Sequence, residues 1–412
     1  MNSFPDAGKI GRTAGLALGL ALLFGLAVVG VHAAFTSQVA GANDFFPRWV
    51  GAQLFWQQGI DPYSQTATEA IQRQMYGGEL ARPDQDQVLF VYPFYTLFLL
   101  LPLTWLPLAY AWIQAIWLVT LMACLVGGML LLLRLVRWPR LPAWLLASLL
   151  LWSLLFYNNA RTLILGQFAA VVFVCLVASL LALRSGHDLT AGALLALTTI
   201  KPQMVFLLIP ALLLWAAWQR RWRFVAGFGG AMALLAGASF LLLPGWLGGF
   251  IAQLRAYPGY TITPSPLRFL TEYFFPWLGR PVEIGAAVLL VGWMLWGWWR
   301  LRRETAVSPT LLLTLGLTLL VGNMVVVRTA TTNYLPLYIP LFVALRYAAV
   351  RLRHGSAWVA AFVWLSIVAL WWLFLATVQG DLEHPIMYLP LPLGLLALLL
   401  AWRPKGTQRT QR

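Results

Sequence analysis

Asp44 and Arg48 place a carboxylate and a guanidinium group one helical turn apart, in a polar stretch that follows the first apolar run of the chain. Side chains at this spacing share one face of a helix and can form an ion pair. A carboxylate can also serve as a general base that removes a proton from a hydroxyl group. Asp44 is equally well placed to cap a helix whose first turn contains Pro47, and the local sequence leaves both roles open.

Other polar residues lie inside or beside apolar runs, where charged and amide side chains are costly and are therefore candidates for function. Lys201 precedes Pro202 between two short apolar segments, and its compact ammonium group is suited to binding a phosphate. Gln167 is expected one turn inside a span, where its amide must bond either to another helix or to a substrate. The substrate-binding residues predicted on this basis are Arg48, Arg161, Gln167, Lys201, Arg328 and Asn333.

The composition is that of a membrane protein, because 61% of the 412 residues are hydrophobic, only 10% are charged, and the mean hydropathy is +0.77. A soluble domain would carry about 25% charged residues. Apolar runs of roughly 20 residues, the length that crosses a bilayer, recur along the chain. We therefore expect an all-α, polytopic membrane protein with about 12 transmembrane helices and with interfacial and re-entrant helices in its outer loops. The predicted crossings cover residues 13–35, 109–133, 142–157, 163–183, 189–200, 202–218, 223–243, 283–299, 308–327, 334–346, 356–377 and 386–402.

The basic residues predict the orientation of the chain in the membrane. The net charge is +15, and if each apolar run crosses once, 19 of the 28 basic residues but only three of the 13 acids fall on the side of the N-terminus. Because Lys and Arg accumulate on the cytoplasmic side of membrane proteins, both termini are expected in the cytoplasm. The chain is then a multi-pass protein of the plasma membrane whose candidate site residues face outward. The charge favours anionic lipids as partners and argues against nucleic acid.

Cysteine and histidine residues form no recognisable metal or disulfide motif. Cys124 and Cys175 both lie in apolar runs, and the four histidines are far apart in the sequence. We therefore predict neither a metal site nor a cofactor on these residues, although carboxylates could still supply ligands for a divalent metal.

The chain is expected to form a single transmembrane domain over residues 1–402, followed by a basic cytoplasmic tail at residues 403–412. The outer loop 36–91 is predicted to carry a helix that lies in the membrane interface and ends at Gly59. A second outer loop, rich in Gly, Pro and aromatic residues, is predicted over residues 244–282.

Two features refine this organisation near the N-terminus. The first span, residues 13–35, is interpreted as an uncleaved anchor rather than a signal peptide, because its apolar run is longer than a signal core. Pro102 and Pro107 interrupt the next apolar run, which we interpret as a half-span or re-entrant helix. Broken helices of this kind are tolerated where they line protein or a wet cavity.

A set of short motifs resembles one family of glycosyltransferases. An Asp soon after the first span is followed by Gly-x-Asp-Pro-Tyr, Phe-Val-Tyr-Pro, Leu-Gly-Gln and Ile-Lys-Pro-Gln, which here are Asp44 and residues 59–63, 90–93, 165–167 and 200–203. In this order and spacing, over roughly residues 13–350, the chain resembles glycosyltransferase family 87 (the DUF2029 group) of the GT-C superfamily. Each motif is short, so the resemblance depends on the ordered set.

The resemblance implies a GT-C fold and transfer of a hexose or pentose, with mannose as one candidate, from a polyprenyl-phosphate donor to an extracytoplasmic glycan or glycolipid. It also implies inversion at the anomeric carbon, with Asp44 as the general base and Tyr92 among the substrate-binding residues. The chain departs from the family at Tyr92-Pro93-Phe94, where relatives often have Tyr-Pro-Pro. It also lacks the histidine that mannosyltransferases carry in a late span, where Asn333 is the nearest polar residue.

The chemistry of the candidate residues agrees with such a transfer. A phosphate is a good leaving group, so one carboxylate among several cations suffices, whereas glycoside hydrolysis uses paired carboxylates. The main alternative is a transporter or a flippase for lipid-linked sugars, because about 12 spans would suit a carrier. Carriers often have two similar halves, and the two halves of this chain look dissimilar. A third possible function is that of a polysaccharide ligase or polymerase that uses the same kind of donor.

Overall fold

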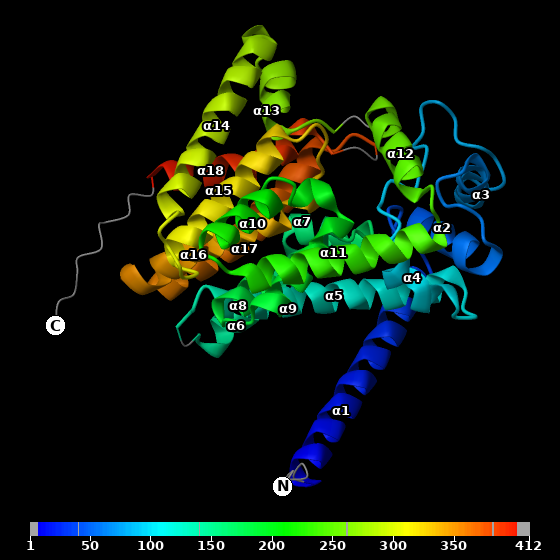
Figure 1. The fold of residues 1–412 in the computed structure, drawn as a ribbon, viewed down its shortest axis with the longest axis horizontal. Coiled ribbons are helices and arrows are strands. Elements are labelled where there is room, and N and C mark those ends of the chain that lie inside the picture. The colour runs from blue at the N-terminus through cyan, green and yellow to red at the C-terminus, as the bar shows by residue number, and fades with distance from the viewer. Residues whose placement is uncertain (1–6, 40, 140, 261–262, 381–382, 402–412) are drawn as a thin grey trace.

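The computed structural model describes residues 7–401 except residues 40, 140, 261, 262, 381 and 382, so the predicted tail at 403–412 lies outside the described residues. The described chain is 77% helical and contains no β-strand, which confirms the all-α fold. Most helices pack side by side into one bundle, while α1 (Ala7–Val31) and α14 (Gly279–Leu301) extend from it in opposite directions (Figure 1).

Five helical segments of the described chain are long and apolar enough to cross a membrane. They contain α1, α5, α11, α14 and α17, and run over Gly15–Thr36, Tyr110–Leu135, Trp222–Leu242, Pro276–Leu301 and Gly355–Thr377. A sixth span results if α6 (Ala143–Leu155) and α7 (Tyr157–Ile164), which meet at a bend of 48°, are counted together. Membrane localisation is thus supported, but the predicted count of about 12 crossings is not confirmed.

Several predicted crossings form helices that are too short to span a bilayer alone. α8 (Ala169–Arg184) has 16 residues, which gives a length of about 24 Å against about 30 Å for the hydrocarbon core. Polar breaks separate α7 from α8, α9 from α10, and α15 from α16. The other short helices of the bundle are α9 (Asp188–Leu197), α10 (Leu208–Trp218), α15 (Pro309–Val325), α16 (Tyr338–Arg351) and α18 (Pro390–Ala401).

The core of the bundle lies where α5 packs against α8 and where α9 packs on both α8 and α11. Trp117 on α5 and Phe168 at the N-terminus of α8 are fully buried there, and their ring centroids lie 4.9 Å apart. Because large aromatic side chains bury much apolar surface, this contact fixes the start of α8 against α5. The polar break before α8 is therefore held against buried aromatic side chains of the core.

The predicted interface helix is α2 (Phe46–Gln58), and it ends as predicted at Gly59, whose φ of 69° lies in the left-handed region. Asp44 does not cap this helix, because Phe45 occupies the N-cap position and no side chain caps the helix. The prediction of a capping role is therefore wrong, and the carboxylate is left for other contacts. α2 packs on the short helix α4 (Thr96–Thr104), to which Trp56 donates an indole hydrogen bond at 3.2 Å.

Two helical regions were not expected from the sequence. α3 (Gln65–Met75) lies within the first predicted outer loop and is capped by the hydroxyl of Ser64. α12 (Trp246–Tyr260) occupies much of the second predicted loop, so residues 244–282 are largely helical rather than irregular. The short elements α13 (Pro266–Arg268), η4 (Phe269–Phe274) and η5 (Pro276–Leu278) follow α12.

Candidate functional site

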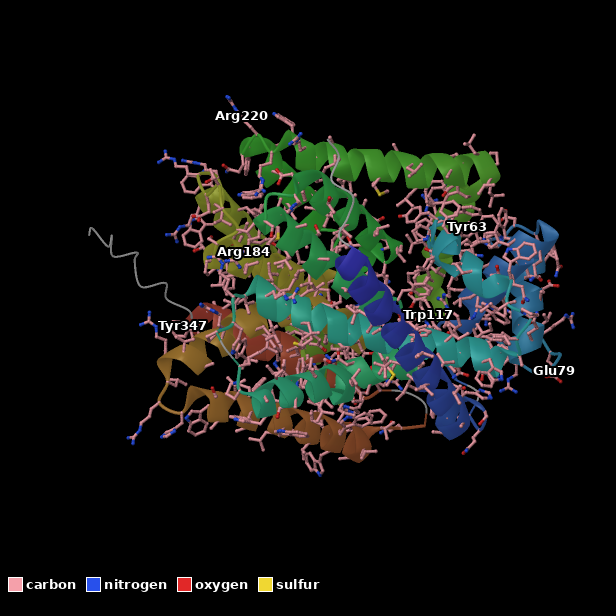
Figure 2. The ribbon with its side chains drawn as sticks, turned by 90° about the horizontal axis from the view of Figure 1, so that it is seen from below. Tyr63, Glu79, Trp117, Arg184, Arg220 and Tyr347 are labelled. Atoms are coloured by element: carbon pink, nitrogen blue, oxygen red, sulfur yellow. The ribbon has the colours of Figure 1, made fainter. Side chains whose placement is uncertain are left out.

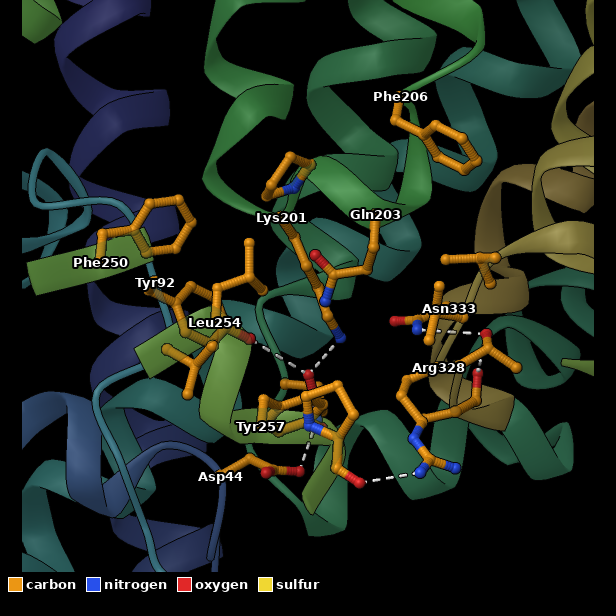
Figure 3. Close-up of a pocket in the computed structure, with 18 of the residues that line it drawn as sticks. Asp44, Tyr92, Lys201, Gln203, Phe206, Phe250, Leu254, Tyr257, Arg328 and Asn333 are labelled. Atoms are coloured by element: carbon orange, nitrogen blue, oxygen red, sulfur yellow. Dashed lines mark hydrogen bonds between the residues drawn. The ribbon is translucent and has the colours of Figure 1, made fainter. Parts of the chain in front are cut away.

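A cavity of about 480 Å³, here called the Asp44 cavity, lies where the polar breaks of the bundle meet (Figure 3). Its walls come from α2 and the residues before it, the segment before α4, the breaks before α8 and α10, α12, and the segment between α15 and α16. Seven of the eight residues predicted from the sequence line it, namely Asp44, Arg48, Tyr92, Gln167, Lys201, Arg328 and Asn333.

Two backbone hydrogen bonds hold the Asp44 segment against the break between α7 and α8. The amide of Ala42 donates to the carbonyl of Ile164 at 3.0 Å, and the amide of Asp44 donates to the carbonyl of Leu165 at 3.1 Å. The side chain of Asp44 remains 27% exposed. Main-chain contacts thus fix the position of this carboxylate at the cavity wall while leaving it accessible.

Gly166 allows this close contact between the two segments. Its φ is 67°, and a Cβ at this position would lie 2.6 Å from the Cβ of Phe45 and 2.9 Å from the Cβ of Ala42. Its carbonyl accepts a hydrogen bond from the indole of Trp117 at 2.8 Å. Both the backbone conformation and the lack of space therefore require glycine at the centre of the Leu-Gly-Gln motif.

Gly166→Ala is expected to destabilise the protein by about 2 kcal/mol through overpacking and to lower kcat/KM by displacing Asp44. Gly77→Ala is the matched control, because Gly77 has nearly the same φ, 65°, with no atom within 4 Å of the added Cβ. The measurements are the thermal unfolding midpoint and the rate of sugar transfer of both variants. Equal effects of the two substitutions would show that the close contact at Gly166 is unimportant.

Gln167 joins Asp44 to Lys201 in a chain of hydrogen bonds. The Gln167 amide nitrogen donates to Asp44 Oδ2 at 2.5 Å, and Lys201 Nζ donates to Gln167 Oε1 at 2.5 Å. The hydroxyl of Tyr92 lies 3.5 Å from the same Gln167 oxygen. Gln167 stands in the break before α8, so the span predicted over residues 163–183 is not one continuous helix around it, because the left-handed Gly166 ends the helical run.

Lys201 reaches this chain from the break between α9 and α10. The break is anchored by the hydroxyl of Tyr95, which donates to the side-chain oxygen of Thr199 at 2.9 Å. Lys201 is only 3% exposed, and burial lowers the pKa of its ammonium group to about 7, an effect that the charge of Asp44 opposes and that of Arg48 reinforces. The site thus holds a buried amine whose protonated form an anionic ligand would stabilise.

Arg48 and Tyr92 form the wall beside Asp44. The guanidinium carbon of Arg48 lies 5.0 Å from the centroid of the Tyr92 ring, a cation–π arrangement. Arg48 Nη1 lies 4.0 Å from Asp44 Oδ1, and Arg48 Nε is buried without a hydrogen-bond partner. The aromatic ring therefore orients a guanidinium group that is only loosely paired with the carboxylate and can serve a second anion.

The Gly-x-Asp-Pro-Tyr motif positions Tyr92 rather than touching the cavity itself. The side chain of Asp61 accepts a hydrogen bond from the amide of Tyr63 at 2.8 Å, which closes a tight turn. The hydroxyl of Tyr63 then donates to the carbonyl of Tyr92 at 2.7 Å. Gln253 on α12 donates to the carbonyl of Tyr63 at 3.1 Å, so the turn also ties α12 to this wall.

Arg328 and Asn333 lie together on the wall formed between α15 and α16 (Figure 3). Arg328 Nη2 donates to the carbonyl of Pro258 at 2.8 Å, and the Asn333 amide donates to the hydroxyl of Thr329 at 3.3 Å. Arg328 Nε and Asn333 Oδ1 are buried without hydrogen-bond partners. Unpaired buried polar atoms are costly, so a bound ligand that pairs with them would stabilise this wall.

The remaining wall is apolar, and sequence reasoning did not find it. Phe250 and Leu254 on α12 line the cavity together with Phe206 and residues 325–327. Phe250, Leu254 and Tyr257 recur at helical spacing, which places them on one face of α12. That spacing was the available signal, but the Gly and Pro content of the segment led to the prediction of a loop.

Arg161 is the predicted site residue that the fold does not bring to the Asp44 cavity. Its Nε pairs with Glu383 Oε1 at 2.9 Å, and the same carboxylate accepts hydrogen bonds from Tyr157 at 2.7 Å and from Thr331 at 2.9 Å. This buried cluster joins α7 to the segment before α18. Arg161 contributes to the cavity only indirectly, because Thr331 belongs to the segment that carries Arg328.

The composition of the cavity wall limits the chemistry that it can support. Asp44 is the only acidic residue among the described residues that line it, and it faces Arg48, Lys201 and Arg328. Within the described part of the chain, no three His, Cys, Asp or Glu side chains gather as a metal site would require. The arrangement offers one proton acceptor, several cations for an anionic group and an apolar surface.

Comparison with known proteins assigns the chain to a family. The family model described as Glycosyltransferase family 87 matches residues 90–327, more than half of the chain, including the residues from Tyr92 to Val327 that line the cavity. No curated protein and no solved structure matches the chain. The chain is thus a membrane glycosyltransferase and belongs to glycosyltransferase family 87.

Proposed function

We propose that the Asp44 cavity transfers a hexose or pentose from a polyprenyl-phosphate donor to the hydroxyl group of a glycan or glycolipid, with Asp44 as the general base. The observation that carries this proposal is the Asp44–Gln167–Lys201 chain of hydrogen bonds, which places one carboxylate and one buried cation on the two ends of a single amide. Membership of a glycosyltransferase family supplies the reaction type.

The cations of the cavity are suited to the phosphate of such a donor. Lys201 is buried at the cavity wall, and Arg48 and Arg328 each carry an Nε that is buried without a partner. When the bond between the anomeric carbon and the phosphate breaks, negative charge develops on the phosphate. Fixed cations in a site with little water stabilise this charge without reorganisation, so no general acid is needed at the leaving group.

Asp44 is suited to the other half of the reaction. Gln167 holds Oδ2, while Oδ1 lies 4.0 Å from the nearest nitrogen of Arg48 and is free of a close ion pair. Oδ1 can therefore accept the proton of an acceptor hydroxyl as its oxygen attacks the anomeric carbon. Attack on the face opposite the leaving phosphate would invert the configuration at that carbon.

The apolar wall supports a lipid-linked rather than a soluble nucleotide donor. Phe206, Phe250 and Leu254 provide a surface along which the first isoprene units can lie. A membrane protein that takes its donor from the bilayer needs such a path, whereas a nucleotide sugar would need polar contacts for its base. Mannose is one candidate sugar, and the reaction would take place on the side of the membrane predicted to be outside.

The direct test is to incubate the purified protein with a panel of labelled polyprenyl-phosphate sugars and glycolipid acceptors and to identify the product. We expect transfer from at least one such donor, with inversion, and none from the matching nucleotide sugars. Transfer from nucleotide sugars alone would overturn the proposed donor class, and movement of intact lipid-linked sugar across vesicles without transfer would favour a flippase.

Donor affinity is expected to fall as the pH rises above about 7, the pKa of Lys201. Below this value the side chain is an ammonium ion that attracts phosphate, and above it the neutral amine does not. The measurement is the donor KM on both sides of this pH, with Lys201→Arg as the control because a guanidinium group stays protonated. A donor KM with the same pH dependence in both proteins would exclude Lys201 as the titrating group.

A further inference from the structure

A second cavity, here called the arginine cavity, lies at the other end of the bundle. It has a volume of about 130 Å³, and arginines and apolar residues line it together. No acidic residue is among the described residues that line it, which are Val136, Arg137, Arg184, Pro309, Leu312, Val343 and Arg346. The three arginines come from the end of α5, the end of α8 and α16, so the tertiary fold alone brings them together.

Backbone carbonyls at the end of α5 hold two of these arginines in place. Arg184 Nη1 donates to the carbonyl of Leu135, and Arg346 Nε donates to the carbonyl of Arg137 at 2.9 Å. Each of these contacts uses one of the five N–H groups of a guanidinium. Arg184 Nε is buried without a hydrogen-bond partner. The backbone therefore orients these two arginines, and Arg184 keeps a buried donor free.

The arginine cavity brings three positive charges together with no carboxylate among its described lining residues. Burial lowers the pKa of Arg184, and the charges of Arg137 and Arg346 lower it further. Arg137 also has a φ of 52°, a left-handed conformation that residues with a side chain rarely adopt. Like charges held together in this way are destabilising unless an anion binds between them, and Arg favours phosphate because its planar donors match phosphate geometry.

The two cavities lie near opposite ends of α5. The part of α5 between Trp117, which contacts the break beside Asp44, and Leu135, which contacts Arg184, has a length of about 27 Å at the helical rise. This is close to the thickness of the hydrocarbon core, about 30 Å. Figure 2 agrees, since Arg184 lies toward the end of the molecule that also carries Arg220 and Tyr347, away from Tyr63 and Glu79.

We propose that the arginine cavity binds the phosphate group of an anionic phospholipid in the leaflet opposite the Asp44 cavity. The arginines would bind the phosphate, and the apolar half formed by Val136, Pro309, Leu312 and Val343 would contact the glycerol and the first methylene groups. Free phosphate shares the ionic chemistry but would leave the apolar half of the cavity unused. The amphipathic lining therefore favours a phospholipid over free phosphate as the ligand.

The test compares anionic lipid, zwitterionic lipid and free phosphate on the full-length protein in neutral detergent. Bound lipid is counted by native mass spectrometry, and stabilisation is followed by the thermal unfolding midpoint. We expect saturable binding and a raised midpoint with phosphatidylglycerol, and neither effect with phosphatidylcholine. If inorganic phosphate raises the midpoint as much as phosphatidylglycerol does and displaces that lipid, the cavity binds free phosphate, and the proposal of a lipid ligand is wrong.

Substitutions of single arginines test whether phosphatidylglycerol binds at the arginine cavity. Arg184→Gln and Arg137→Gln should each weaken phosphatidylglycerol binding by about tenfold, the loss of one hydrogen bond from a charged group. Arg137→Gln keeps the backbone carbonyl that Arg346 binds, so it tests the charge without loss of that contact. Arg134→Gln is the matched control, because Arg134 is exposed in the last turn of α5 and does not line the cavity. An equal loss in Arg134→Gln, or none in the other two, would overturn the proposal.

Discussion

Asp44→Asn is expected to lower kcat for sugar transfer by about 10²–10⁴-fold, the usual contribution of a general base. Asn has the shape of Asp but cannot accept the proton of the acceptor hydroxyl. Its side-chain oxygen can still accept the hydrogen bond that Gln167 donates to Oδ2 at 2.5 Å, and its backbone amide can still donate to Leu165. The cavity should therefore keep its geometry and lose only its base.

Asp84→Asn is the matched control for this substitution. Asp84 lies in the exposed loop before α4, 76% of its side chain is exposed, and it forms an ion pair with Arg82. The measurements are kcat, both KM values and the unfolding midpoint of the two variants. A kcat for Asp44→Asn close to that of Asp84→Asn would remove Asp44 as the base, whereas a fall in midpoint would point to a structural role.

Lys201→Met is expected to raise the donor KM by about 10–100-fold, the loss of one hydrogen bond from a charged group. A fall in kcat should accompany it, because the ammonium would stabilise charge that develops on the phosphate. Met preserves the length of the buried side chain, so packing in the break between α9 and α10 should survive. The acceptor KM should not change, since the hydroxyl is assigned to the Asp44 side of the cavity.

Lys201→Arg separates charge from shape at the same position. A guanidinium group keeps the positive charge but is larger and distributes its donors in a plane, so partial recovery of donor affinity is expected. The measurements are the KM values for donor and acceptor in both variants and the unfolding midpoint. Equal loss toward donor and acceptor, or a large fall in midpoint in both variants, would show that Lys201 supports the fold rather than binding phosphate.

The fold class could be predicted from the sequence because it depends on local and additive properties. Apolar runs long enough to cross a bilayer must satisfy their backbone groups within a helix, whatever their neighbours are. The end of α2 at Gly59 was predicted for a similar reason, since glycine adopts the left-handed conformation at low cost. The match to family 87 over residues 90–327 covers three of the motifs on which the resemblance was based, those at residues 90–93, 165–167 and 200–203.

The predictions that failed concern helices whose limits depend on distant contacts. The span predicted over residues 163–183 is divided because Gly166 packs against Phe45 and Ala42, which are more than a hundred positions earlier. The loop predicted over residues 244–282 is largely helical, and α12 is held through Gln253 by the turn at Tyr63. Hydropathy indicated a continuous span at the first place and glycine and proline content indicated a loop at the second, but tertiary packing decided both conformations.

The sequence by itself determined that this chain is an all-α membrane protein, and it singled out the polar residues whose presence beside apolar runs needs a functional reason. Only the tertiary structure decided which of them meet. In the folded chain, Gln167 forms hydrogen bonds with both Asp44 and Lys201, whereas Arg161 pairs with Glu383 outside the Asp44 cavity. The physical reason is that hydropathy places a residue at a membrane depth, whereas the packing of helices against one another decides which side chains face each other at that depth.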